Sequence, residues 1–203
     1  MTPFDKIEKE KLYAVIRTQK KEDALREIKA VTEGGIKIVE IVLENPEIAQ
    51  ALKEITAMEN KPLIMAGGII TERQAQIAID FGADVVVSPI FQMNLVRLCK
   101  SQIPLIMTAT TPNEAYAAWK ARTQLIKISP ASPMGGAEYI EDILRPMKFL
   151  NLIAAGSIDI DEIPLYIKAG VKAVGLGRAL FKNATYEEIV ARTKSACDKI
   201  KLV

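Results

Sequence analysis

Two kinds of segment alternate along the whole chain. The first kind is short, almost wholly apolar and rich in β-branched residues, and the second is longer, with apolar residues at helical spacing. The short runs cover residues 13–17, 36–43, 63–66, 85–87, 105–108, 125–128, 152–155 and 173–176. Near-continuous apolar runs of this length are typical of parallel strands that are buried on both faces. The pattern therefore predicts eight strands, each followed by a helix.

The helical spacing is clearest near the end of the chain. One face there carries Tyr186, Ile189, Val190, Thr193, Cys197 and Ile200. Glycine marks the predicted helix ends, because Gly34 and Gly35 follow the first long helical segment and Gly82 and Gly170 follow later ones. Eight units in 203 residues leave about 25 residues for each strand with its helix, which is near the minimum for a parallel crossover.

This order of elements indicates an α/β fold. Strict alternation without a hairpin signal predicts an all-parallel sheet with right-handed crossovers. Eight such units can close into a (β/α)₈ TIM barrel, and the alternative is an open doubly wound sheet. We favour the barrel because the strand count fits and the turn after Arg17 lacks a glycine-rich dinucleotide-binding pattern. No linker or low-complexity tract interrupts the chain, so we expect residues 1–203 to form a single barrel domain with a short N-terminal helix.

The amino-acid composition mainly excludes classes of function. The chain has no histidine, which excludes histidine-based catalytic triads and histidine-ligated metal sites. Lys plus Arg is 27 and Asp plus Glu is 25, so a formal net charge of +2 gives no large basic excess for nucleic acid. No apolar run approaches the roughly 20 residues that span a bilayer, and no signal peptide is apparent. Cys99 and Cys197 lie outside any CxxC motif, and we expect buried, reduced thiols in helices of a cytoplasmic protein.

Three apolar strands carry a charge near the end where a barrel holds its active groups: Arg17, Glu40 and Lys127. An unpaired buried charge costs on the order of several kcal/mol, so these groups need partners. One interpretation is a structural ion-pair network in which Lys127 is matched to Glu40. The other is catalytic. Desolvation would lower the pKa of Lys127, a free amine can form a Schiff base with a ketone, and Glu40 would be the general acid–base. Spacing alone leaves both interpretations open.

Glycine turns follow the third, seventh and eighth strands. Gly156 and Ser157 come after the seventh strand, and Gly177 and Arg178 come after the eighth. Barrels frequently bind phosphate at these two loops, where backbone amides approach the anion and an arginine can add a bidentate contact. The alternative is a pair of tight turns, and we favour an anion site. Gly67 and Gly68 end the third strand, where they make room for a ligand or turn the chain.

These motifs together resemble the class I aldolases that act on 2-keto-3-deoxy-6-phosphogluconate and 4-hydroxy-2-oxoglutarate, the KDPG/KHG aldolase family. The similarity spans nearly the full length and keeps the order of motifs. Segments similar to the family's VAVLR, AGG-x-x-x-(I/L)-E-(I/V), FIVSP, TPTE, LKIFP and GVGSAL are residues 13–17, 33–41, 85–89, 111–114, 126–130 and 175–180.

The resemblance implies that Lys127 is the Schiff-base lysine and Glu40 the acid–base residue, with no metal or cofactor. It implies that the substrate is a small 2-oxo acid, phosphorylated at its far end, with Arg17 in the pocket and Gly156, Gly177 and Arg178 at the phosphate loops. We also expect Gly67, Gly68, Ser129 and Ser157 to contact the substrate. The reaction would cleave a 2-keto-3-deoxy (phospho)sugar acid or 4-hydroxy-2-oxoglutarate to pyruvate and an aldehyde. The assembly would be a homotrimer working in carbohydrate metabolism.

Several positions depart from the family pattern. Gly68 stands where the family has a threonine that holds the pyruvyl carboxylate, Ser129 replaces an aromatic residue, and Ala155 and Arg178 also differ. A second hypothesis is therefore a non-catalytic barrel of this family that binds an anion or phosphosugar or serves a structural role. A third is a thiamine-phosphate synthase-like enzyme, which would need Mg²⁺ carboxylates where only Glu40 and Glu44 lie close together.

Overall fold

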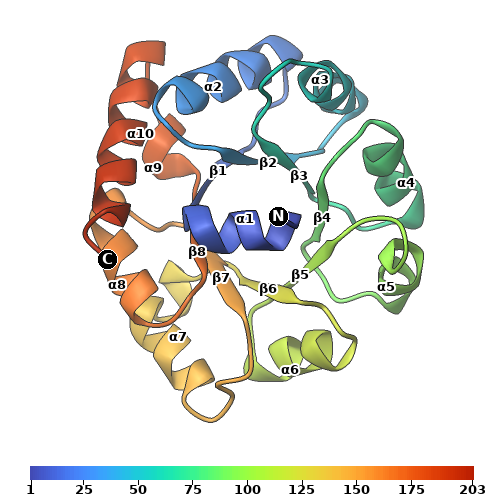
Figure 1. Cartoon of the computed structure of the whole chain (residues 1–203), viewed down its shortest axis with the longest axis vertical. Helices are drawn as coiled ribbons and strands as arrows, with labels where there is room; N and C mark the ends of the chain where they lie inside the picture. Colours follow the sequence, from blue (N-terminus) through green and yellow to red (C-terminus); the bar gives the residue numbers. More distant parts are fainter.

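The computed structural model describes all residues, 1–203, and its centre is a closed barrel of eight parallel strands. The strands pair in chain order, and the last one pairs back with the first (Figure 1). The predicted (β/α)₈ barrel is confirmed, and the open sheet is excluded. The strands are β1 Leu12–Ile16, β2 Ile38–Val42, β3 Leu63–Gly67, β4 Val85–Ser88, β5 Leu105–Ala109, β6 Leu125–Ile128, β7 Leu152–Ala155 and β8 Ala173–Leu176.

Helices surround the barrel, and several of them begin at a side-chain cap. Threonine hydroxyls at positions 2, 71, 111 and 185 accept hydrogen bonds from backbone amides in capping boxes. The helices are α1 Pro3–Glu10, α2 Lys21–Glu33, α3 Pro46–Thr56, α4 Glu72–Asp80, α5 Met93–Cys99, α6 Pro112–Lys120, α7 Gly136–Leu144, α8 Ile163–Lys168, α9 Arg178–Phe181 and α10 Tyr186–Ile200, with 3₁₀ turns η1 Ser132–Met134 and η2 Ile160–Glu162.

The barrel wall separates two apolar cores. Along each strand, alternate residues face outward to the helices or inward to the barrel axis. The inward-facing cluster is Ile7, Tyr13, Ile38, Leu63, Met65, Val85, Val87, Ile106, Leu125, Ile153, Ala155 and Ala173. Side chains fill this interior. A ligand can therefore bind only above them, at the C-terminal ends of the strands.

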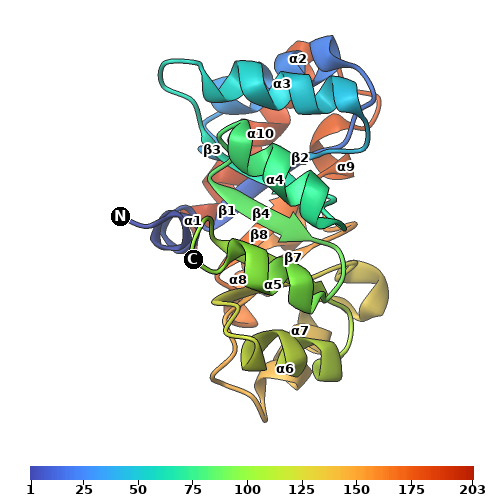
Figure 2. The ribbon, with the colours of Figure 1, turned by 90° about the vertical axis from the view of Figure 1, so that its right-hand side faces the viewer.

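Helix α1 closes the N-terminal end of the barrel. It lies across that end in Figure 1, and Figure 2 shows it on the side away from the strand arrowheads. Ile7 is fully buried in the interior cluster, and Phe4 packs against the same cluster. The predicted short N-terminal helix is therefore confirmed, and the structure adds that it seals the floor of the barrel.

Both cysteines are free, as predicted, and both lie in helices. Cys99 at the end of α5 is buried, and burial raises the pKa of its thiol to about 11. The prediction that both are buried is wrong for Cys197, which is only half-buried on α10. None of the helices is both long enough and apolar enough to cross a membrane.

Candidate active site

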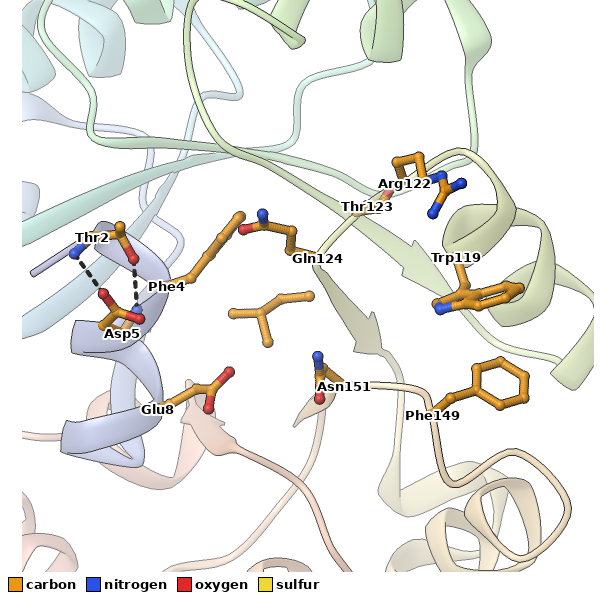
Figure 3. Close-up of a pocket in the computed structure, with 11 residues that line it drawn as sticks. Thr2, Phe4, Asp5, Glu8, Trp119, Arg122, Thr123, Gln124, Phe149 and Asn151 are labelled. Atoms are coloured by element: carbon orange, nitrogen blue, oxygen red, sulfur yellow. Dashed lines mark hydrogen bonds between the residues drawn. The ribbon is translucent and has the colours of Figure 1, made fainter.

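Cavities of similar size lie at the two ends of the barrel. The cavity at the N-terminal end measures about 460 Å³ and lies beside α1, where Figure 3 shows Phe4 and Glu8 facing Gln124 and Asn151. The other cavity measures about 450 Å³ and lies at the C-terminal ends of the strands. Both Lys127 and Glu40 line this second cavity. Because barrel enzymes hold their chemistry at this end, the second cavity is the candidate active site.

Lys127 and Glu40 meet at the base of this cavity. Lys127 projects inward from β6 and Glu40 from β2, on opposite sides of the barrel. The Lys127 Nζ lies 2.7 Å from each of the two carboxylate oxygens, Oε1 and Oε2. The residues are only 7% and 3% exposed. The expected pairing is therefore present, as a buried contact short enough for a proton to pass between amine and carboxylate.

A glycine on β3 makes room for the Glu40 carboxylate. A Cβ atom at Gly67 would lie 2.6 Å from Oε1 and 3.0 Å from Cγ of Glu40. Any larger residue there would push the carboxylate out of its place. The sequence pattern predicted that Gly67 makes room for a ligand or turns the chain, whereas the structure shows it making room for a side chain of the site itself.

An ion pair lies at the rim of the cavity. The Arg17 guanidinium, directly after β1, donates to the Glu44 carboxylate, and the Gln19 side-chain amide donates to the same carboxylate at 2.5 Å. The Arg17 side chain is 66% exposed, so it is free to exchange Glu44 for another anion. Gly68 and Ser129 line the same cavity.

The other four expected binding residues form a separate cluster beside the cavity. Arg178 donates a hydrogen bond to the Ser157 hydroxyl, which joins the loops after β7 and β8. A Cβ at Gly156 would lie 2.6 Å from Cα of Pro130, so the loop after β7 packs against the segment that follows Lys127. Gly156, Ser157, Gly177 and Arg178 do not line the cavity that holds the Lys127–Glu40 pair.

Some lining residues were not expected. Gln74 lines the cavity, and its Oε1 accepts hydrogen bonds from the backbone amides of Ile70 and Thr71. The signal for Gln74 was present in the sequence, because Thr71-Glu72-Arg73-Gln74 follows the capping-box pattern directly after a strand.

The structure offers no group of three or more acidic, cysteine or histidine side chains that could hold a metal ion. Glu40 is bound by Lys127, and Glu44 is bound by Arg17 and Gln19. The thiamine-phosphate synthase-like alternative therefore lacks the carboxylate cluster that it requires.

Known proteins resemble this chain in sequence and in structure. Residues 4–200 match the family model described as KDPG and KHG aldolase. A probable 2-dehydro-3-deoxy-6-phosphogalactonate aldolase of Rhizobium meliloti is 31% identical over 84% of this chain and 82% of its own length.

Two solved structures share both the barrel and 25% of the aligned residues. One is a native KDPGal structure, with a TM-score of 0.85 over 94% of each chain. The other is KDPG aldolase from Legionella pneumophila with pyruvate captured as a covalent carbinolamine, with a TM-score of 0.83 over 92% of this chain and 93% of the other. The family match over nearly the whole length, together with this shared barrel, shows that the chain belongs to the KDPG and KHG aldolase family of carbon–carbon lyases.

Proposed function

We propose that Lys127 and Glu40 carry out the aldolase reaction of this protein on a 2-keto-3-deoxy (phospho)sugar acid or 4-hydroxy-2-oxoglutarate. The observation that carries the proposal is the buried contact in which Lys127 Nζ lies 2.7 Å from both Glu40 oxygens, at the base of a cavity of about 450 Å³. The related Legionella enzyme, in which pyruvate is bound as a carbinolamine, supports a covalent amine mechanism.

The first half of the reaction forms the Schiff base. A proton passes from the Lys127 ammonium to the Glu40 carboxylate, which leaves a nucleophilic amine and a carboxylic acid. The amine attacks the C2 ketone of the substrate, and the resulting alkoxide takes a proton from the attacking nitrogen to give a neutral carbinolamine. Glu40 then protonates the C2 hydroxyl, which leaves as water, and the nitrogen lone pair forms the iminium. Glu40 is a carboxylate again at this stage.

The second half cleaves the carbon–carbon bond. Glu40 accepts the proton of the C4 hydroxyl through a water, the C3–C4 bond breaks, and the aldehyde forms. The bonding electrons move to C3 as an enamine, with the iminium acting as the electron sink. Glu40 returns a proton to C3, and hydrolysis of the iminium by one water releases pyruvate and Lys127 as its ammonium form, with Glu40 a carboxylate as at the start. Each proton and electron pair is accounted for without a metal or cofactor.

The charges around the cavity support binding of an anionic substrate. Arg17 at the rim can exchange Glu44 for a substrate carboxylate or phosphate. The Arg178 guanidinium, held on Ser157 in the neighbouring loop cluster, is the second cation for the far end of the substrate.

Borohydride trapping with pyruvate, followed by peptide mass mapping, tests the mechanism. We expect a reduced pyruvyl adduct on Lys127 and on no exposed lysine such as Lys37. In the Glu40→Gln variant, turnover should fall roughly 100-fold or more while slow trapping remains measurable. A folded protein that forms neither the adduct nor pyruvate from phosphorylated keto-deoxy acids would contradict the proposal and support the non-catalytic barrel.

We also propose that the protein assembles as a homotrimer, as the family resemblance implies. An exposed aromatic surface supports association: Trp119 stacks on Tyr116 and packs at a tilted angle against Phe149, and all three rings are exposed outside the barrel. Such patches on soluble domains often mark protein contacts. Analytical ultracentrifugation tests the proposal, and sedimentation as a monomer at micromolar concentration would contradict it.

A further inference from the structure

Tyr13 places a polar group inside the otherwise apolar lower part of the barrel. Inward side chains of such barrels stack in layers, with every second strand contributing to each layer. The observed strand registers put Tyr13 in a layer with Met65, Ile106 and Ile153. The next layer toward the C-terminal end consists of Glu40, Val87, Lys127 and Gly175. Tyr13 therefore lies directly beneath the proposed catalytic pair.

The ring of Tyr13 rises into the layer of that pair. Gly175 is the only member of the layer without a side chain, and a Cβ there would lie 2.4 Å from Cζ and 2.6 Å from the hydroxyl oxygen of Tyr13. The phenol end thus fills the place that β8 leaves empty. Lys127 and Glu40 approach from opposite strands of this layer, and the Glu40 carboxylate extends toward Gly67, so the hydroxyl lies beneath their contact.

The Tyr13 hydroxyl is fully buried and has no hydrogen-bond partner. A buried hydroxyl without a partner is costly, and a phenylalanine would fill the same space without that cost. Burial, and secondly the neighbouring Glu40 carboxylate, raise the pKa of the phenol well above its ordinary value. The hydroxyl therefore stays protonated and remains an unused donor.

The proposed reaction creates an acceptor for this donor. In the free protein both Glu40 oxygens accept from Lys127 Nζ. Once that nitrogen is bonded to the substrate as an iminium, it keeps a single N–H and can no longer serve both oxygens. An unpaired oxygen of a buried carboxylate is costly, so Glu40 then requires a new hydrogen-bond donor.

Building on the proposed function, we propose that Tyr13 is a positioning residue whose hydroxyl donates a hydrogen bond to Glu40, directly or through one water, after Lys127 has bonded to the substrate. The bond holds Glu40 toward C3 and C4 and favours its charged form. Tyr13 itself transfers no proton.

The Tyr13→Phe variant removes only the unpartnered oxygen, and Tyr166→Phe is its matched control. Tyr166 on α8 is equally buried and its hydroxyl is also unpartnered, but it lies outside the barrel. The readouts are borohydride trapping, deuterium exchange at C3 of pyruvate, and the pH profile of turnover. We expect Tyr13→Phe to trap pyruvate on Lys127, to exchange roughly 10-fold more slowly with little change in KM, and to show its acidic limb at higher pH. Tyr166→Phe should match the wild type throughout.

The outcomes separate this inference from the proposed function. If Tyr13→Phe exchanges at the wild-type rate with an unshifted acidic limb while both proteins trap pyruvate, the role of Tyr13 is wrong and the proposed function stands. If the wild type itself forms no adduct on Lys127, both the role of Tyr13 and the proposed function are wrong. The melting temperature of Tyr13→Phe should equal or exceed that of the wild type, and a variant that fails to fold would overturn the premise of an unpartnered hydroxyl.

Discussion

The Gly67→Ala substitution tests whether the space beside Glu40 is needed for catalysis. An added Cβ would lie 2.6 Å from Glu40 Oε1, whereas the closest contacts that Cβ atoms tolerate are about 3.0–3.4 Å. The carboxylate must therefore retreat by about 0.4–0.8 Å. Its Cγ and Cδ atoms, at 3.0 and 3.2 Å, are also too close for rotation of the carboxylate alone to relieve the contact.

This retreat would act on both activity and stability. A displacement approaching 1 Å between reacting groups costs up to about 100-fold in rate, so we expect kcat to fall roughly 10- to 100-fold. Weakening the buried Lys127–Glu40 pair should lower the free energy of unfolding by about 2 kcal/mol, less than its complete loss would. In a domain of this size that corresponds to a decrease in Tm of roughly 4–8 °C.

A coupled pyruvate assay and thermal melting followed by circular dichroism measure the two effects. The Glu40→Asp variant supplies the control, because the shorter acid cannot reach Lys127 and so loses the pair completely. We expect Glu40→Asp to lose more Tm and more activity than Gly67→Ala, and the added methyl group to cost little further in the double variant, where the shorter acid leaves room for it. Wild-type kcat and Tm in Gly67→Ala would show that Glu40 has free space, and the reasoning would be refuted.

Three further predictions concern single positions. Burial is the main cause that raises the pKa of Glu27 from 4.5 to about 7, with Asp23 adding to it and Arg26 opposing it. The folded protein therefore holds a proton that the unfolded chain loses, and stability falls as pH rises from about 4.5 to 7. The full pKa shift corresponds to roughly 3 kcal/mol of unfolding free energy, and the partial exposure of Glu27 reduces this value. In urea unfolding, Glu27→Gln should therefore stabilise the protein by about 1–2 kcal/mol at pH 8 and hardly at pH 4. An equal gain at both pH values would contradict this. Arg178→Ala should raise KM roughly 10-fold for a phosphorylated substrate and leave KM for an unphosphorylated one unchanged, and a uniform increase would count against an anion contact. Gly175→Ala should displace the Tyr13 ring and lower Tm by several degrees, roughly 4–8 °C, as measured by calorimetry, whereas an unchanged Tm would show that the ring has room to move.

Local patterns were enough to predict the strands and the pairing of Lys127 with Glu40. A strand buried on both faces must be apolar, so a charge inside it stands out, and the register of β5, β6 and β7 then carries Lys127 to the cavity. The strands 125–128, 152–155 and 173–176 have the predicted bounds. The run 36–43 was too long because Ile36 and Leu43 are buried without belonging to β2.

Contacts between distant strands could not be predicted in the same way. The ring of Tyr13 reaches the level of Glu40 only because the strands are staggered around the closed barrel and Gly175 leaves a gap. The Arg17–Glu44 pair likewise depends on how the loops after β1 and β2 lie side by side. The binding residues were expected on a single surface, but they divide between the cavity and the Ser157–Arg178 cluster beside it. The direction of a loop depends on its packing against neighbouring segments, which the residues of the loop alone do not determine.

The helix that seals the floor has a consequence for the order in which products leave. With Ile7 and Phe4 of α1 packed beneath the interior cluster, side chains fill the barrel below the candidate active site, and the C-terminal end is the route to it. In the proposed mechanism the three-carbon fragment is bonded to Lys127 at the base of the cavity, and the aldehyde would lie between it and solvent. Departure would then be sequential, with the aldehyde first and pyruvate second. Added pyruvate should therefore compete with the full-length substrate for the free protein, while added aldehyde should inhibit only by running the reaction backward.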